Sequence, residues 1–328
     1  MTEAETLSLA EEAIAHWEGC TAPRLLSHRE NAVFAIALSD GRRGVLRLHR
    51  RGYQSTDAIR SELWWMQALA GAGVAVPRPE PTRDGALLAH LDDGRVASVL
   101  SWIAGTPLAS GAGPLDGGAA EQLRRFVELG HAIGKLHVAT DRLTLPQGFS
   151  RPHWDIDGLL GPAPFWGRFW DHPAASDAEA ILLQEARRFA RERLSAYAAA
   201  GGDHGLIHAD LMRENVLFDG PRAHLIDFDD CGFGFRIYDL GTALVPNLEE
   251  PELDAIATGL LEGYADERGL NDDDLAMLPV FVMLRTLASV GWTMPRLTSD
   301  DPRIRAYLNR AVRTAHAVME GRPLFRIG

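Results

Sequence analysis

The chain has 328 residues, of which 46% are hydrophobic and 24% are charged, and its formal net charge is −12. This is an ordinary globular composition, and the acidic balance argues against a general nucleic-acid-binding surface. The only two cysteines, Cys20 and Cys231, form no paired motif, which argues against a disulfide framework or a thiolate zinc site. The start of the chain lacks the layout of a signal peptide, and no run of about 18 uncharged apolar residues predicts a membrane span. We therefore expect a cytoplasmic protein without a membrane partner.

The first hundred residues predict a sheet with one helix. Residues 32–50 form two extended runs around an Asp-Gly pair, and residues 85–105 form a second hairpin of the same kind. Between the hairpins, residues 56–73 have apolar residues at helical spacing, with Thr56 or Asp57 as the candidate cap.

After residue 105 the pattern becomes mainly helical. Residues 119–140 and 177–200 predict long amphipathic helices, and residues 146–176, rich in Pro, Gly and Trp, predict an irregular segment between them. We expect three parts: a sheet part with one helix at 1–100, a hinge at 101–106, and a larger, mainly helical part at 107–328. Ligands often bind where two such parts join.

The segment "LIHADLMRENVLFDG" at 206–220 places chargeable residues inside a run of apolar ones. Burying unpaired charge is costly, so this cluster indicates a functional site. "VLF" and "AHLIDF" predict two short antiparallel strands, with Asn215 at the start of one and Asp227 at the end of the other. Asp210 lies five residues before Asn215. The hairpin therefore predicts that an amide and two carboxylates share one site.

An amide and carboxylates without cysteine suit a hard divalent ion that keeps some of its water, and Mg²⁺ fits best. Magnesium held by so few protein ligands usually completes its shell with the phosphates of a substrate. The cluster therefore predicts binding of a nucleoside triphosphate and transfer of its terminal phosphoryl group.

The same residues carry a resemblance to a known family. "HADLMRENVLF" followed by "IDFDD" resembles the catalytic loop and metal-binding motif of the aminoglycoside phosphotransferase and choline kinase branch of the protein-kinase-like folds. Ala209 replaces the usual arginine, and "DFD" replaces the triplet that ends in glycine; both departures are typical of the small-molecule branch. The likeness extends from about Asn31 to Ala243. It implies an α+β, protein-kinase-like bilobal fold, with a small antiparallel sheet and one helix in the first lobe and a larger, mainly helical second lobe.

The resemblance also implies roles for the clustered residues. Asp210 would accept the proton of the attacking hydroxyl or orient that hydroxyl, and a positioned base is typically worth 10²–10⁴ in rate. Asn215 and Asp227 would hold Mg²⁺ against the phosphates of ATP. His208 would brace the loop by hydrogen bonds, and Asp229 would assist either the metal or the loop.

On the nucleotide side, the resemblance assigns residues from the first hundred. Arg47 takes the strand position usually held by lysine, and Glu62 is the helix carboxylate that steadies it. The usual glycine-rich loop is missing, and Asn31 would help to cover the phosphates. Ser101 and Ile103 lie in the segment that would receive adenine through backbone groups.

The acceptor is not named by the sequence. Acids beside aromatics can hold an amine by charge and cation–π contact, although aromatic packing and helix capping explain the same residues. Homoserine, choline, aminoglycosides and methylthioribose are acceptors of relatives, and the Pro- and Trp-rich insert is similar to that of the homoserine kinases and of a bacterial stress-response kinase. The candidate contacts are Trp154, Asp155, Trp166 and Asp300.

We expect an ATP- and Mg²⁺-dependent phosphotransferase acting on a small amine-bearing or amino-acid-like hydroxyl substrate. A Ser/Thr protein kinase is the first alternative, but "YDLGTALVP" follows soon after Asp227 where an activation segment would stand. A metal-dependent phosphohydrolase would need further His and Asp ligands. An inactive nucleotide-binding module is the third alternative, although the residues that such modules usually lose are present here.

Overall fold

The computed structural model describes residues 2–28, 30–109 and 113–327. Within them the chain divides into two compact units, which are treated separately below. The first unit contains residues 1–105, 143–151 and 224–229, and the second contains residues 106–142, 152–223 and 230–328.

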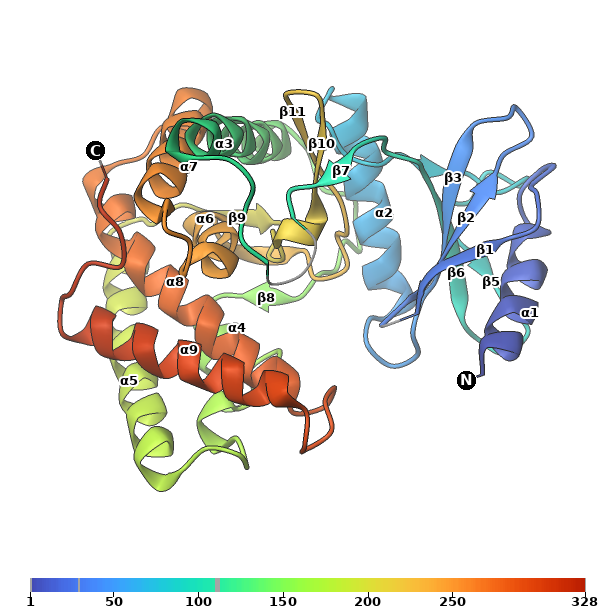
Figure 1. The fold of residues 1–328 in the computed structure, drawn as a ribbon. Coiled ribbons are helices and arrows are strands. Elements are labelled where there is room, and N and C mark those ends of the chain that lie inside the picture. The colour runs from blue at the N-terminus through green and yellow to red at the C-terminus, as the bar shows by residue number, and fades with distance from the viewer. Residues whose placement is uncertain (1, 29, 110–112, 328) are drawn as a thin grey trace. The chain divides into compact units, whose positions relative to one another are not determined.

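The first unit is built on an antiparallel sheet with strand order β1-β2-β3-β6-β4, to which β5 adds by pairing with β6. Helices α1 and α2 lie on opposite sides of this sheet (Figure 1). The elements are α1 (Glu3–Ile14), β1 (Arg24–His28), β2 (Ala32–Ala37), β3 (Arg43–Leu48), α2 (Thr56–Gly71), β4 (Pro79–Glu80), β5 (Ala89–His90) and β6 (Val96–Ser101). Both predicted hairpins and the helix predicted at 56–73 are confirmed, but the expectation of one helix was wrong, because α1 is a second helix of this unit.

Alternation along β2 and β3 decides which side chains enter the core of the first unit. Phe34 and Leu46 are buried and belong to one apolar cluster with Trp17 and residues of α1. Because successive strand residues point to opposite faces, Arg47 projects from the other face, where α2 lies. This places a charged side chain beneath a helix.

Helix α2 begins one residue earlier than the candidate caps allow. Ser55 has extended backbone angles, and its hydroxyl accepts a hydrogen bond from the Ala58 amide at 3.1 Å. Thr56 is already inside the helix, so the expectation that Thr56 or Asp57 caps it was wrong. All of these residues favour caps, and only the backbone geometry distinguishes them.

The second unit is mainly helical. A three-stranded sheet has the order β11-β10-β7, and another has the order β8-β12-β9, in which β12 runs parallel to β8 and antiparallel to β9. The elements are β7 (Thr106–Pro107), α3 (Ala119–Asp141), β8 (His153–Trp154), α4 (Ile156–Leu160), η1 (Phe169–Asp171), α5 (Asp177–Ala199), β9 (His204–Ile207), η2 (Arg213–Asn215), β10 (Val216–Asp219), β11 (Arg222–Leu225), β12 (Gly232–Phe235), α6 (Ile237–Leu244), η3 (Val245–Asn247), α7 (Leu253–Arg268), α8 (Asp272–Thr293) and α9 (Pro302–Met319).

The two predicted long helices and the hairpin of β10 and β11 are confirmed, but β11 ends at Leu225, two residues before Asp227. Strand β12 was not predicted, because glycine disfavours strands. Its glycines are required by close packing. A Cβ on Gly232 would overlap the carbonyl oxygen of Pro152, and one on Gly234 would lie 2.6 Å from a side-chain carbon of Ile207.

Helices α3 and α7 pack side by side through glycines (Figure 1). A Cβ on Gly130 of α3 would overlap the carbonyl oxygen of Leu260, and a Cβ on Gly263 of α7 would overlap that of Val127. The backbones approach this closely only because neither glycine has a side chain. Since α3 carries His137, this contact also fixes a residue that supports the site.

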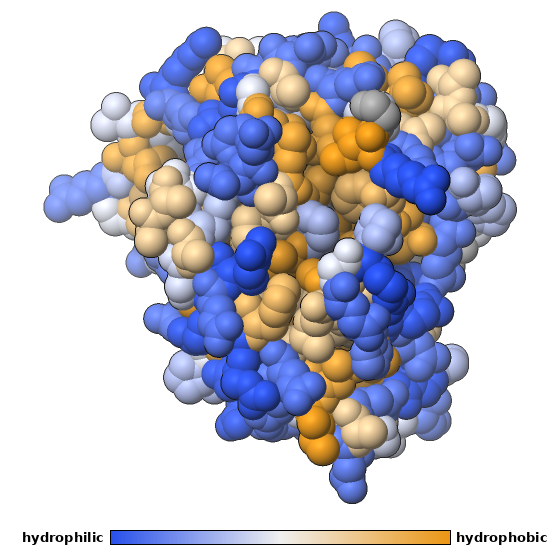
Figure 2. Space-filling model, turned by 90° about the vertical axis from the view of Figure 1, so that its left-hand side faces the viewer, coloured by the Kyte–Doolittle hydropathy of each residue, from blue (hydrophilic) through white to orange (hydrophobic). Residues whose placement is uncertain are grey.

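Helix α8 is the central apolar helix of the second unit. Its length and composition match those of a membrane-spanning helix, but 78% of the matching segment is buried inside the protein, as in the core helix of a soluble protein. Figure 2 shows one face of the molecule, on which hydrophilic residues predominate and hydrophobic residues gather in smaller areas.

We predict that Ser55→Ala lowers the free energy of unfolding by about 1 kcal/mol, because the first-turn amide of Ala58 loses its acceptor. Thr56→Ala should change it much less. Urea unfolding of the two variants measures the difference, and equal losses would show that the cap is misassigned.

We also predict that Gly263→Ala destabilises the chain by about 1–3 kcal/mol or more, because the added methyl group overlaps backbone atoms of α3. The control is Gly71→Ala in α2, where a Cβ meets nothing within 4 Å. Alanine favours a helix over glycine, so this control should be neutral or slightly stabilising. A Gly263→Ala variant as stable as the control would refute the close contact.

Candidate active site

The first unit holds a buried ion pair between its sheet and α2. Arg47 Nη1 lies 2.7 Å from Glu62 Oε1, and both side chains are almost completely buried. Glu62 reaches this position because Ala58, Glu62 and Trp65 fall on the buried face of α2. A buried charge persists only when it is paired, so the two residues depend on each other.

The segment 224–229 brings two more carboxylates to Arg47. Arg47 Nη2 lies 3.3 Å from Asp229 Oδ1 and 3.9 Å from Asp227 Oδ1. Burial alone would lower the pKa of Arg47, but the carboxylates of Glu62, Asp229 and Asp227 raise it above its ordinary value. The side chain of Asp229 is buried, whereas that of Asp227 is 51% exposed. The backbone φ of Asp227 is 62°. The exposed carboxylate therefore stands on a strained backbone position, of the kind that clusters at functional sites.

Arg151 is a second buried guanidinium in this unit, and the sequence did not point to it. It donates to the carbonyl oxygens of Asp229 at 2.6 Å and Ala58 at 3.1 Å, and its Nη1 lies 3.7 Å from Glu62 Oε2. Arg151 therefore ties the backbone around Asp229 to the same carboxylate that holds Arg47. In the sequence, Arg151 is an isolated arginine in an irregular segment. The sequence pattern does not distinguish such a buried arginine from one on the surface.

The second unit presents Asp210 with both carboxylate oxygens engaged. Asn215 Nδ2 donates to Asp210 Oδ2 at 2.9 Å and to the Asp210 carbonyl at 2.8 Å, and Arg285 Nη2 lies 2.6 Å from Asp210 Oδ1. Asp210 itself is partly exposed, whereas Arg285 is buried. The five-residue spacing of Asp210 and Asn215 therefore brings their side chains into direct contact.

Asp239 fixes the backbone of the loop that carries Asp210. Its carboxylate accepts hydrogen bonds from the amides of His208 at 2.8 Å and Ala209 at 2.7 Å. Ala209 has φ of 66°, a left-handed conformation that is costly for alanine. The Asp239 carboxylate therefore holds the loop backbone in this conformation. His208 contributes locally, because its Nδ1 lies 3.3 Å from the Asp210 amide.

A buried chain of hydrogen bonds supports Asp239 in turn. His137 Nε2 lies 3.1 Å from Asp239 Oδ2, and His137 Nδ1 lies 2.9 Å from the Tyr264 hydroxyl. Burial lowers the pKa of His137, so the neutral ring donates from Nε2 and accepts at Nδ1. Burial by itself would raise the pKa of Asp239, but the hydrogen bonds from the His137 ring and from the His208 amide lower it. Asp239 is therefore a stable buried anion.

Asn215 and Asp227 carry the oxygen atoms that are expected to hold a metal ion. Because Asn215 Nδ2 faces Asp210, its Oδ1 is the end that remains to bind a ligand. Asp227 offers an exposed carboxylate in the other unit. Within the described residues no group of three or more His, Cys, Asp or Glu side chains is arranged as a metal site.

The residues expected near the nucleotide lie in the first unit. Asn31 Oδ1 accepts from the Arg50 amide at 3.0 Å, which ties the turn before β2 to the end of β3. The Ser101 amide donates to the Arg78 carbonyl, and the Ser101 hydroxyl accepts from the Arg78 amide. Ile103 follows β6 and is half-buried. Contact of these residues with a nucleotide stays a prediction.

The residues expected at the acceptor lie in the second unit. Trp154 is 1% exposed, donates to the Asp230 carbonyl at 2.8 Å and packs edge-on against Trp166. Asp155 caps α4, and Asp300 lies on the turn before α9. Trp166 carries the guanidinium of Arg285 on its ring face, 4.4 Å from the ring centroid. Their contact with an acceptor also stays a prediction.

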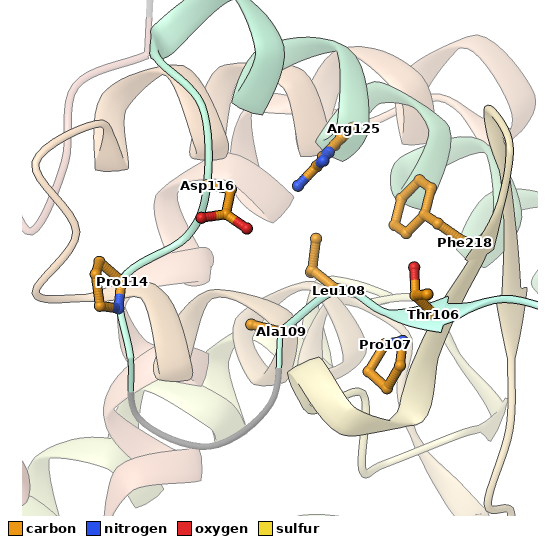
Figure 3. A pocket seen from close by; sticks show the side chains of 8 residues that line it. All are labelled: Thr106, Pro107, Leu108, Ala109, Pro114, Asp116, Arg125 and Phe218. Atoms are coloured by element: carbon orange, nitrogen blue, oxygen red, sulfur yellow. The ribbon is translucent and has the colours of Figure 1, made fainter.

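A cavity of about 310 Å³ opens elsewhere in the second unit. Figure 3 shows Asp116 and Arg125 pointing into it from the segment before α3 and from α3, with Phe218 of β10 on the opposite side. Arg125 is paired with Glu121 at 2.8 Å. None of the expected site residues lines this cavity, so it is separate from the loop of Asp210.

The sequence profile of the phosphotransferase enzyme family matches residues 21–274, which is more than half of the chain. The chain belongs to this family. Homoserine kinase of Rhizobium etli strain CIAT 652 is 33% identical over 244 residues, covering 72% of this chain and 68% of that protein. The enzyme is therefore a phosphotransferase, and that expectation is confirmed.

Solved structures support the same assignment. A microcompartment-associated aminopropanol kinase is 31% identical and superposes with a TM-score of 0.82, covering 96% of this chain and 98% of that one. An amicoumacin kinase in complex with AMP-PNP, Ca²⁺ and its substrate is 19% identical, with a TM-score of 0.76 over 100% of this chain and 96% of that one, and so shares the fold. The α+β, kinase-like fold is confirmed, and the nucleotide in the amicoumacin kinase structure is an ATP analogue.

Burial lowers the pKa of His49 to about 3, so the folded enzyme keeps this ring neutral beside Ser98. An unfolded chain protonates histidine near 6.5 and therefore binds more protons between about pH 3 and 6.5. We predict that the free energy of unfolding falls as the pH is lowered through this range. The contribution of His49 is at most about 1.4 kcal/mol per pH unit.

His49→Gln should show a shallower loss than the parent enzyme in urea unfolding between about pH 5 and 6.5. The matched control is His90→Gln, at an exposed position, which should keep the parent slope. Equal slopes for the His49 variant and the parent would contradict a neutral buried ring.

Proposed function

We propose that the enzyme is an ATP- and Mg²⁺-dependent kinase that phosphorylates a hydroxyl of a small amine-bearing or amino-acid-like substrate in the cytoplasm. The observation that carries the proposal is the side-chain contact between Asp210 and Asn215, on a loop fixed by Asp239. The names of the relatives support the acceptor class, because homoserine and aminopropanol each combine a hydroxyl with an amine.

In the proposed reaction, the acceptor hydroxyl oxygen forms a bond to the γ-phosphorus of ATP while the bond to the bridging oxygen of ADP breaks. Asp210 orients the hydroxyl and takes its proton. The proposed metal ligands are Asn215 through Oδ1 and the carboxylate of Asp227. Bound Mg²⁺ supplies neutralisation of charge on the phosphates.

Arg47 is proposed to contact the α- and β-phosphates, in the place that kinases usually give to lysine. Its Nη1 donates to Glu62 and its Nη2 to Asp229, and these two contacts use only two of the five N–H donors of the planar group. Asp229 is proposed to pair with Arg47 rather than to bind metal directly, because it lies 3.3 Å from the guanidinium and is buried. Asn31, Ser101 and Ile103 keep their proposed nucleotide contacts.

Asp210→Asn tests the proposed base. We predict loss of phosphoryl transfer by at least about 100-fold, because the amide cannot accept the hydroxyl proton. The affinity for ATP in the presence of Mg²⁺ should stay close to that of the parent, measured by calorimetry. Loss of nucleotide binding, or full transfer activity, would contradict the assigned role.

Asp227→Ala tests the proposed metal ligand. ATP binding by the parent enzyme should tighten when Mg²⁺ is added, and the variant should lose most of that response. Asp219→Ala, on the exposed end of β10, is the control and should respond as the parent does. An unchanged metal response of the Asp227 variant would reject the assignment.

The acceptor class is tested by ADP release with a panel that contains L-homoserine, 1-amino-2-propanol, choline, an aminoglycoside and a generic protein substrate. We predict turnover with an amino alcohol or hydroxy amino acid. Turnover with the protein substrate alone would instead favour a Ser/Thr protein kinase.

A further inference from the structure

Helix α8 carries one conspicuous charge. Between Asp274 and Thr293 every residue except Arg285 is uncharged, and this arginine is only 3% exposed. Placing a guanidinium in the centre of an apolar helix is costly unless the group is paired. The residue that pairs with Arg285 therefore indicates the function of this charge.

The described partners of Arg285 are few and specific. Its Nη2 lies 2.6 Å from Asp210 Oδ1, and the ring of Trp166 lies against its planar face, 4.4 Å from the centroid. Among the described residues, neither Nε nor Nη1 of Arg285 has a hydrogen-bond partner. Two unsatisfied buried donors weaken the fold, so stability alone does not explain this side chain.

The contacts around Asp210 form a two-point clamp. Arg285 engages Oδ1 and Asn215 Nδ2 engages Oδ2, so rotation of the carboxylate would break one contact or the other. The Arg285 end of the clamp is itself fixed, because the guanidinium is buried and lies on an indole ring. A carboxylate held in this way keeps one orientation before any substrate binds.

We propose that Arg285 is a positioning residue for phosphoryl transfer, which fixes the direction in which Asp210 meets the acceptor hydroxyl. The proposal rests on the proposed function, because it acts through the role of Asp210 as base. Transfer is sensitive to such positioning, and a displacement of about 1 Å can cost about 100-fold in rate. Loss of the guanidinium therefore affects turnover more than nucleotide binding.

The test compares Arg285→Met and Arg285→Lys with the parent enzyme, using L-homoserine and 1-amino-2-propanol as acceptors. If neither supports turnover, hydrolysis of ATP by water is measured instead. We predict that Arg285→Met lowers kcat by about 100-fold while KM for ATP changes less than about threefold. Arg285→Lys should give an intermediate kcat, because a lysine keeps the charge but not the planar geometry.

Arg187→Met is the matched control. Arg187 also lies over a tryptophan of the second unit, 3.8 Å from the Trp170 ring centroid, and donates to the Leu160 carbonyl, but its described partners do not include Asp210. The Arg187→Met variant should be less stable than the parent enzyme but should have the same kcat. If Arg285→Met does not fold, Arg285→Gln, which keeps a donor and loses the charge, takes its place and is expected to lower kcat similarly.

A double variant decides whether Arg285 acts through Asp210. In the Asp210→Asn background, Arg285→Met should cause no further loss of the residual rate, since the carboxylate that it positions is gone. A full additional loss there, or a parent-like kcat for Arg285→Met, would overturn the proposal. If Asp210→Asn itself retains full activity, the proposed function fails first, and the two failures are thereby distinguished.

Discussion

The loop that carries Asp210 depends on one interaction, which is the pair of hydrogen bonds that the buried carboxylate of Asp239 accepts from the loop backbone. The carboxylate accepts the amides of His208 and Ala209, and so holds alanine in a left-handed conformation that it would not adopt by itself. That single turn decides where the next residue, Asp210, points. The packed helices fix His137, His137 forms a hydrogen bond with Asp239, and Asp239 in turn holds the loop. Glycines at the α3–α7 contact matter to function for this reason, although they are not near the reacting groups.

Charge is organised separately in each unit. In the first unit two buried guanidinium groups, Arg47 and Arg151, face Glu62 and the residues 227–229, so the carboxylates exceed the cations before a ligand binds. In the second unit Arg285 partly neutralises Asp210. An excess of oxygen ligands suits a divalent cation that arrives with its nucleotide, whereas a preformed cluster of many ligands would hold the metal permanently. Pairing thus makes the buried charges tolerable, while the carboxylate of Asp227 stays exposed.

The sequence predicted the parts of the site that depend on local spacing. Asp210 and Asn215 are five residues apart, and Asp239 follows in a short helix, so their relation is encoded within one stretch of chain. Arg47 and Glu62 were assigned through the resemblance to the family, from their places in a strand and in the helix that follows it. Arg151 and Arg285 were missed because their partners lie 78 and 75 residues away in the chain, and distant pairing leaves no periodic pattern. Strand β12 was missed because its glycines have a low strand propensity. They are present because neighbouring segments pack too closely for a side chain.

The kcat of Asp239→Asn shows whether the Asp239 carboxylate fixes the loop that presents Asp210. The amide retains the size of the carboxylate but replaces one acceptor oxygen with a donor, which opposes an amide N–H of the loop. We expect kcat to fall about 100-fold while the ATP affinity stays close to that of the parent, because the proposed phosphate contacts lie in the first unit. A folded Asp239→Asn enzyme with parent-like kcat would contradict it.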